Sequence, residues 1–97
     1  MSAEIEEIMK RFQNYPNVVG IIIVDLFAIP IKTTLDYNLT VHYATLVSNL
    51  LSKASKMVHS LDMTNELTSI RLRTSKHEVI IVPEENFFII VLQNPSD

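Results

Sequence analysis

Few side chains in this sequence could do catalytic or metal chemistry, and their spacing keeps them apart. The histidines His42 and His59 are 17 residues apart on one expected helix, which separates them by about 25 Å at 1.5 Å per residue. His77 lies far from both in the sequence. Glu84 and Glu85 adjoin in an expected turn, where a solvated pair is commoner than a catalytic dyad, and no serine lies in a G-x-S-x-G motif. The sequence therefore predicts a protein that is not an enzyme and that binds no cofactor.

The composition of the 97-residue chain narrows the class of protein further. Gly20 is its one glycine, whereas phosphate-binding loops and dinucleotide fingerprints need several. The absence of cysteine excludes disulfides and thiolate metal sites. A net charge of -3, with scattered basic residues, predicts no nucleic-acid partner. Hydrophobic residues make up 47% of the chain, which favours burial of some apolar surface against another subunit.

Length and apolar runs predict one domain over residues 1–97, without membrane insertion. The longest apolar run covers residues 18–24, far short of the ~20 residues that a spanning helix needs. The opening MSAEIEEIMKRF has acidic residues where a signal peptide would have a basic start. We therefore expect a cytoplasmic protein.

Residues 39–61 have the longest helical pattern, with their apolar side chains in one arc of about 160°. Asn38 is the expected N-cap, with Asp36 as the alternative. One border of the apolar arc carries small residues, which are Ala44, Ser48 and Ser55. This border is either an ordinary flank of the helix or a groove where a second helix comes close.

Five segments have strand-like patterns, and a shorter amphipathic helix over residues 3–14 precedes them. The strand segments are 18–24, 29–34, 67–74, 78–82 and 87–92. Strands that are apolar on both faces belong in the centre of a sheet, whereas the strand with Pro30 and the half-polar strand 67–74 belong at its edges. Hairpin adjacency then gives the order 2-1-5-4-3, with strands numbered along the chain. The predicted fold class is α+β, an α/β/α sandwich in which a helix covers each face of a five-stranded antiparallel sheet.

The expected edge strand 67–74 has no proline or obvious bulge to block pairing with another chain. Ile70 and Leu72 point to one face of this strand, and Arg71 and Arg73 point to the other. The two arginines are either gatekeepers against aggregation or the flanks of a specific edge-to-edge contact. The pattern alone favours neither.

The turn between the first two strands carries bulky apolar residues where Gly, Asn or Asp is usual. Its tip reads Asp25-Leu26-Phe27-Ala28. Leu26 and Phe27 either cover the local core or contact a partner. In a chain this small an aromatic side chain gains nothing from exposure to water, so we expect Phe27 to cover the core.

Four stretches in register along nearly the whole chain carry a family resemblance: IPIKTTLD, YATLVSNLLSKA, LTSIRLRTSKHEVIIVP and IIVLQNP. Together they resemble the roadblock/LC7 dynein light chains, whose five antiparallel strands between helices agree with the predicted fold. The resemblance implies a dimer in which the third strand pairs with its copy across a two-fold axis, through Ser69, Ile70, Arg71, Leu72, Arg73 and Thr74. It also implies a contact between the two long helices through Ala44, Ser48, Leu51 and Ser55.

The resemblance further implies a non-catalytic light chain of the dynein motor, which dimerises with itself or with a paralogue. Such a dimer binds the dynein intermediate chain and supports cargo attachment and microtubule-based transport. The implied location is the cytoplasm and its microtubule cytoskeleton, or the axoneme of a cilium or flagellum. The alternative is a roadblock-type scaffold or regulator of a small GTPase.

The chain departs from the family at the hairpin tip, where an acidic residue and Gly commonly precede Ile-Pro-Ile. Phe27 and Ala28 stand at these positions. An Ala forced to φ > 0 costs ~1 kcal/mol, so the departure leaves the type of turn open. It is either tolerated drift or an added apolar contact, and Leu26 and Phe27 are therefore a candidate partner-contact loop.

Overall fold

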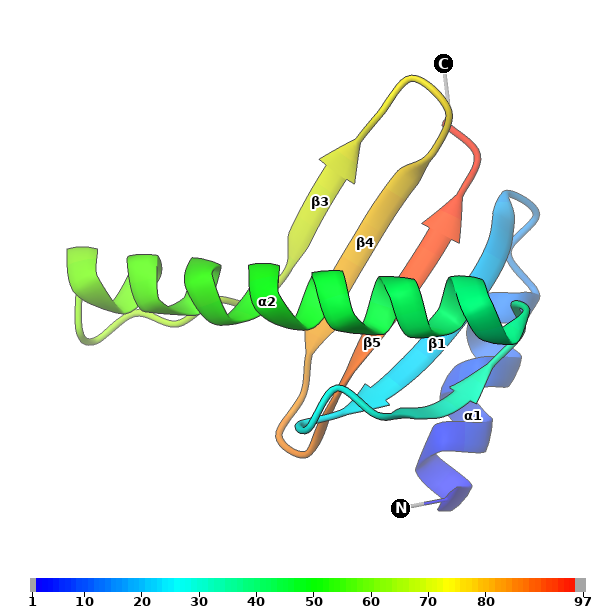
Figure 1. Cartoon of the computed structure of the whole chain (residues 1–97), viewed down its shortest axis with the longest axis horizontal. Coiled ribbons are helices and arrows are strands. Elements are labelled where there is room, and N and C mark those ends of the chain that lie inside the picture. The colour runs from blue at the N-terminus through cyan, green and yellow to red at the C-terminus, as the bar shows by residue number, and fades with distance from the viewer. Residues whose placement is uncertain (1, 96–97) are drawn as a thin grey trace.

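A computed structural model describes residues 2–95 as two helices and five strands (Figure 1). In chain order these elements are α1 (Ser2–Gln13), β1 (Val18–Asp25), β2 (Pro30–Thr33), α2 (Tyr37–Leu61), β3 (Ile70–Arg73), β4 (Glu78–Pro83) and β5 (Phe87–Gln93). The order of helices and strands predicted from the sequence is confirmed.

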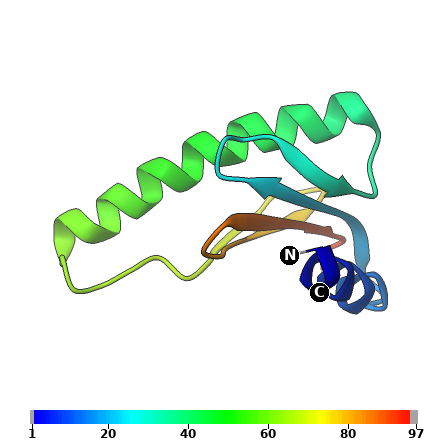
Figure 2. The same cartoon turned by 90° about the horizontal axis from the view of Figure 1, so that it is seen from below.

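The five strands form one antiparallel sheet in the order β2-β1-β5-β4-β3. The apolar strands β1 and β5 lie at its centre, and β2 and β3 form its edges. Figure 2 shows α2 on one face of the sheet and α1 on the other. The predicted α/β/α sandwich and its strand order are therefore confirmed.

Alternating side chains of the central strands divide the core into two layers. Ile22 and Val24 of β1 and Ile90 of β5 lie in the layer under α2, whereas Ile21 and Ile23 of β1 lie under α1. Each of these side chains is at most 1% exposed. Burial of both faces is why β1 is apolar at nearly every position.

The helix α2 begins two residues earlier than the sequence pattern predicts. Its N-cap is Asp36, whose Oδ1 accepts a hydrogen bond from the N–H of Leu39 at 2.8 Å. The prediction of Asn38 as the cap is wrong, because Asn38 already lies inside the first turn, and the alternative is confirmed. Thr40, which is 2% exposed, then places its Oγ1 2.8 Å from the Oγ1 of Thr33 and so joins the helix to β2.

The helix α2 is longer than the sheet is wide. Its 25 residues span about 37 Å at 1.5 Å per residue, whereas five strands spaced ~4.8 Å apart span about 19 Å. The C-terminal part of α2 therefore extends past β3, and the segment 62–69 returns from its end to the sheet (Figures 1 and 2). This return shortens the predicted strand 67–74 to Ile70–Arg73, because the residues before Ile70 are still approaching the sheet.

No helix within residues 2–95 is long and apolar enough to cross a membrane. Over the same residues, no three His, Asp or Glu side chains form a group that could hold a metal ion. Oppositely charged side chains instead form ion pairs, such as the pair between Glu6 of α1 and Lys32 of β2.

Candidate functional site

The outer edge of β3 is open to pairing with another strand. At the turn into β4, the N–H of Thr74 donates to the carbonyl oxygen of His77 at 2.8 Å. Hydrogen bonding alternates along an antiparallel pair, so Leu72, two residues before Thr74, also directs its backbone groups to β4. The backbone groups of Arg71 and Arg73 therefore point outward along the edge, in the direction from which a further strand would approach.

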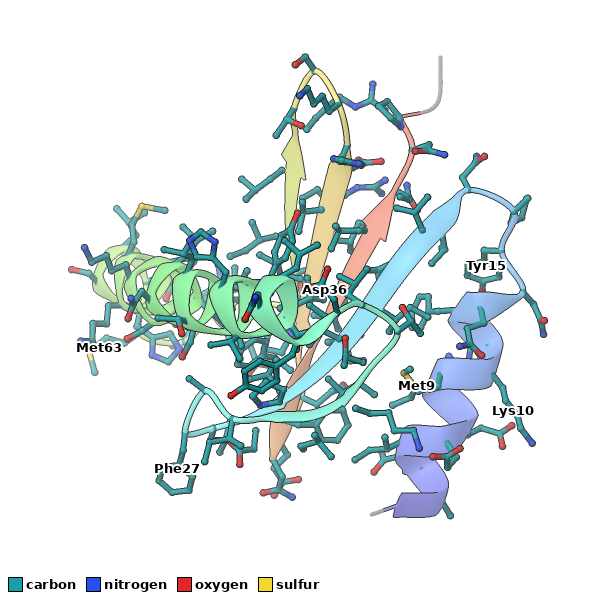
Figure 3. All side chains as sticks on the ribbon, turned by 45° about the vertical axis from the view of Figure 1, so that its right-hand side comes forward. Met9, Lys10, Tyr15, Phe27, Asp36 and Met63 are labelled. Atoms are coloured by element: carbon teal, nitrogen blue, oxygen red, sulfur yellow. The ribbon has the colours of Figure 1, made fainter. Side chains whose placement is uncertain are left out.

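The part of α2 beyond β3 exposes large apolar side chains. Met57 is 60% exposed and Leu61 is 80% exposed, and Met63 in the return segment is 88% exposed (Figure 3). Leu72 of β3 is 41% exposed, although its strand partner Val79 lies in the core layer under α2. One end of the subunit thus combines an open strand edge with an uncovered length of apolar helix.

The sequence predicts a helix–helix contact through four residues of α2, which are Ala44, Ser48, Leu51 and Ser55. Ala44 is 1% exposed and lies in the core of its own subunit. The other three are half-buried, and Leu51 also packs against that core. In the predicted pairing strand, residues 69–74, all side chains are exposed except the half-buried Ile70. Both contacts stay predictions, and Ala44 offers almost no surface to a second chain.

On its other flank, which the sequence pattern did not single out, α2 exposes the apolar side chains of Leu39, Leu46 and Met57. Val47 is 6% exposed and faces the sheet, so Leu46 and Ser48 lie about 100° to either side of it. Leu46 is 56% exposed, and Leu39 and Met57 continue its line along the helix. The sequence pattern cannot identify this flank. It gives an apolar arc of about 160° on the helix, but not which side of that arc packs on the sheet and which side stays exposed.

Comparison with known proteins decides the family of a chain with this fold and this open edge. A family model described as the Roadblock/LC7 domain matches residues 4–94. The chain belongs to the Roadblock/LC7 family. Among solved structures, this Roadblock/LC7 chain is similar to a Roadblock/LC7 domain from Streptomyces avermitilis, with 14% identity, a TM-score of 0.81, and coverage of 89% of this chain and 73% of the other.

Two further structures similar to this Roadblock/LC7 chain are of MglB proteins. Myxococcus xanthus MglB is 15% identical, with a TM-score of 0.74 over 87% of this chain and 70% of the other. An MglB with a tetrameric arrangement is 8% identical, with a TM-score of 0.77 over 96% of this chain and 71% of the other. At such identities these likenesses show a shared fold.

The hairpin tip of this Roadblock/LC7 chain adopts a turn that Gly would favour. Ala28 has φ 67°, in the left-handed region. Asp25 fixes the turn, because its Oδ1 accepts hydrogen bonds from the N–H of Phe27 at 2.8 Å and of Ile29 at 3.0 Å. Phe27 lies at the outer end of the hairpin (Figure 3) and is 84% exposed, and Leu26 is 60% exposed. The expectation that Phe27 covers the core is wrong, since this turn directs the ring outward.

Replacing Phe27 by Ala is expected to change the free energy of unfolding by less than ~0.5 kcal/mol, because the exposed ring adds little to the core. As a control in the same turn, Ala28→Gly is expected to stabilise the fold by up to about 1 kcal/mol, since Gly adopts the positive φ without a Cβ penalty. Denaturant melts of the two variants measure both effects. A loss above about 2 kcal/mol for Phe27→Ala would instead indicate a packed ring.

A buried carboxylate joins β3, β4 and β5 on the face opposite α2. Glu78 of β4 is 5% exposed. Its Oε1 accepts from Gln93 Nε2 at 2.8 Å, and its Oε2 accepts from Arg71 Nε at 3.1 Å and lies 3.0 Å from Arg71 Nη2. The amide of Gln93 and the guanidinium groups of Arg71 and Arg73 hold the pKa of Glu78 below its usual value, although burial opposes this. Arg71 therefore has a partner within its own subunit, which neither interpretation of the arginines from the sequence includes.

Acid is expected to remove the stability that Glu78 contributes. Its pKa is lower in the folded chain than its ordinary value of 4.5, so the contribution is fully present above that pH and is lost as pH falls through the lower folded value. Melts recorded at decreasing pH should therefore decline less steeply below about pH 4.5 for Glu78→Gln than for the wild type. The exposed Glu85→Gln serves as the control, and equal slopes for Glu78→Gln and wild type would contradict the prediction.

Proposed function

We propose that this Roadblock/LC7 chain is a non-catalytic dynein light chain, which acts as a two-fold dimer that binds a segment of the dynein intermediate chain. The observation that carries the dimer in this proposal is the extension of α2 past the open edge of β3 (Figure 1). A protein that works alone would leave this end of the molecule as an aggregation hazard. A second copy would satisfy the edge and the helix together.

A two-fold axis beside β3 would bring the open strand edge of one copy against that of the other, and the extended part of each α2 over the other copy's sheet. Pairing of β3 with its copy would use the outward backbone groups of Arg71, and would continue the sheet under the extended part of α2. Met57 and Leu61 would then lie over the partner's sheet rather than in water. One of the similar structures, MglB, has a tetrameric arrangement, which supports self-association in this fold.

The dynein part of the proposal is supported by the stretches IPIKTTLD, YATLVSNLLSKA, LTSIRLRTSKHEVIIVP and IIVLQNP, which resemble the dynein light chains of the family. The same resemblance supports, as part of the proposal, a location in the cytoplasm on microtubule-associated dynein, or in an axoneme. No catalytic group is assigned, because the proposed role is binding.

Sedimentation at micromolar concentration is expected to give about 22 kDa, twice the chain mass of 11.1 kDa. Calorimetry with an intermediate-chain segment should then show saturable binding and a negative heat-capacity change from apolar burial. A stable monomer would contradict the dimer. A dimer that ignores the intermediate chain would contradict the dynein role alone.

The second candidate function is regulation or scaffolding of a small GTPase. It is the alternative role that the sequence resemblance implies for roadblock-type proteins, and the structural likeness to two MglB proteins rather than to a dynein subunit leaves it open. The discriminating measurement is calorimetry with a small GTPase loaded with GDP or GTP, beside the intermediate-chain segment. Binding of the GTPase without binding of the intermediate chain would replace the first function by the second.

A further inference from the structure

A groove follows α1 on the sheet face opposite α2. Its first part is a cavity of about 310 Å³ between α1 and the strands β4 and β5. A second cavity of about 580 Å³ extends from Val82 past the end of β4 to the segment 66–68. The two cavities share Val82 and Glu84, so they adjoin and together make up the groove. Its apolar lining comes from Ile8, Phe12, Leu67, Val82, Pro83 and Ile89.

The charged side chains that line this groove are mostly acidic. Five glutamates face it from α1, from the return segment and from the β4–β5 turn, namely Glu4, Glu7, Glu66, Glu84 and Glu85. Among the described residues that line the groove, Arg11 is the one basic residue, so their net charge is -4 (five carboxylates and one guanidinium). Glu6, on the same helix, does not line the groove and instead pairs with Lys32.

The groove is preformed rather than created by a movement of α1. Ile5 and Met9 anchor this helix to the sheet and are 3% and 5% exposed. Ile8 and Ile89 are also largely buried, whereas Phe12 and Val82 are half-buried and accessible to a ligand. A rigid apolar floor with a charged rim is the arrangement that binds a peptide with little ordering of the receptor.

We propose that this groove binds an amphipathic, basic segment of a partner protein, with apolar side chains on the floor and Lys or Arg side chains beside the glutamates. Charge complementarity identifies the occupant, because the acidic rim repels nucleic acid and anionic lipid and attracts a basic peptide. The proposal deepens the proposed function and rests on it, since the segment is the part of the partner that each subunit of the dimer holds.

The probe is a fluorescent peptide of roughly 14 residues, about four helical turns, with Leu at i, i+3, i+4 and i+7 spacing and Lys on both borders. The full chain is expected to bind it, and binding is expected to weaken by ~10-fold or more between low and high ionic strength. A peptide with Glu in place of each Lys is expected not to bind. Fluorescence anisotropy measures both affinities.

Matched variants test whether the groove, rather than the net charge of the chain, attracts the peptide. Combined Glu4→Gln, Glu7→Gln and Glu84→Gln is expected to lower the affinity by ~10-fold or more. Glu6→Gln removes one charge from the same helix outside the groove, and is expected to weaken binding less than Glu7→Gln does. Far-ultraviolet circular dichroism and melts of each variant confirm that it is folded.

Each contrary outcome has a distinct meaning. Equal losses for Glu6→Gln and Glu7→Gln would overturn the groove in favour of general charge attraction. Preference for the Glu peptide, or for a single-stranded oligonucleotide, would overturn the basic occupant. Sedimentation of the same samples separates the two proposals, because a dimer that fails to bind the Lys peptide overturns only the groove, whereas a monomer overturns the proposed dimer.

Discussion

Replacing Arg71 by Pro is expected to convert the proposed dimer into folded monomers. The N–H of Arg71 points to the open edge of β3, so Pro removes a donor that only a second strand would use, and its ring obstructs that strand. Because the proposed dimer is two-fold symmetric, its interface would contain the substitution twice, once from each subunit. A cost of about 3 kcal/mol or more would raise the dissociation constant more than about 100-fold, which sedimentation across a concentration series measures.

Two control variants make this result specific to the strand edge. Arg71→Gln removes the contact with Glu78 but keeps the backbone donor, so it should remain dimeric. Leu72→Pro removes an N–H that faces β4, so it should also destabilise the monomer. If Arg71→Pro sediments as a dimer with the wild-type dissociation constant, the subunits do not associate through β3.

The strand order and the two layers were predictable because they depend on burial, on one proline and on short connections, all of which the sequence shows. Strands 18–24 and 87–92 are apolar on both faces and must lie centrally, Pro30 requires an edge, and short connections fix which strands are neighbours. With these constraints, one order remained. The same local reasoning located the open edge at β3, because the alternation of Ile70 and Leu72 with two arginines indicates a half-covered strand.

Features that depend on contacts between distant segments were not predictable. Glu78 reads as the end of an apolar strand, and its ion pair with Arg71 appears only when the β3–β4 register is known. The acidic groove likewise requires the placement of α1 beside β4, more than sixty residues further along the chain. The hairpin differs, because its contacts are local. The sequence shows that Ala28 suits the turn poorly, but it does not show that Asp25 holds the turn with two hydrogen bonds.

The sequence and the structure point to different flanks of α2 as the one that would contact a second copy. The small-residue flank, with Ser48 and Ser55, would allow a close approach of two helices. The opposite flank, with Leu46 and Met57, exposes large apolar side chains whose burial would stabilise a dimer. The exposed contacts favour the second flank, since the first has little apolar surface left to bury around Ser48 and Ser55, and its exposed Tyr37 and Val41 lie in the first two turns of α2.

Leu46→Asp is therefore expected to weaken the dimer by several kcal/mol, which at ~1.4 kcal/mol per tenfold is 100-fold or more in the dissociation constant. The substitution places an unpaired carboxylate against apolar side chains, once in each subunit. In the monomer the effect should be small, because the side chain at this position is 56% exposed.

Ser48→Asp is the matched variant, because it introduces the same charge two residues away on the opposite flank of α2. If the two helices meet through Leu46, then Ser48→Asp should leave the dissociation constant within about threefold of the wild type, since the new charge then lies outside the contact. The reverse ranking, with Ser48→Asp the more disruptive, would restore the contact through Ser48, Leu51 and Ser55. Because both variants carry the same net charge, their difference reports which flank the second helix covers and not the charge of the subunit.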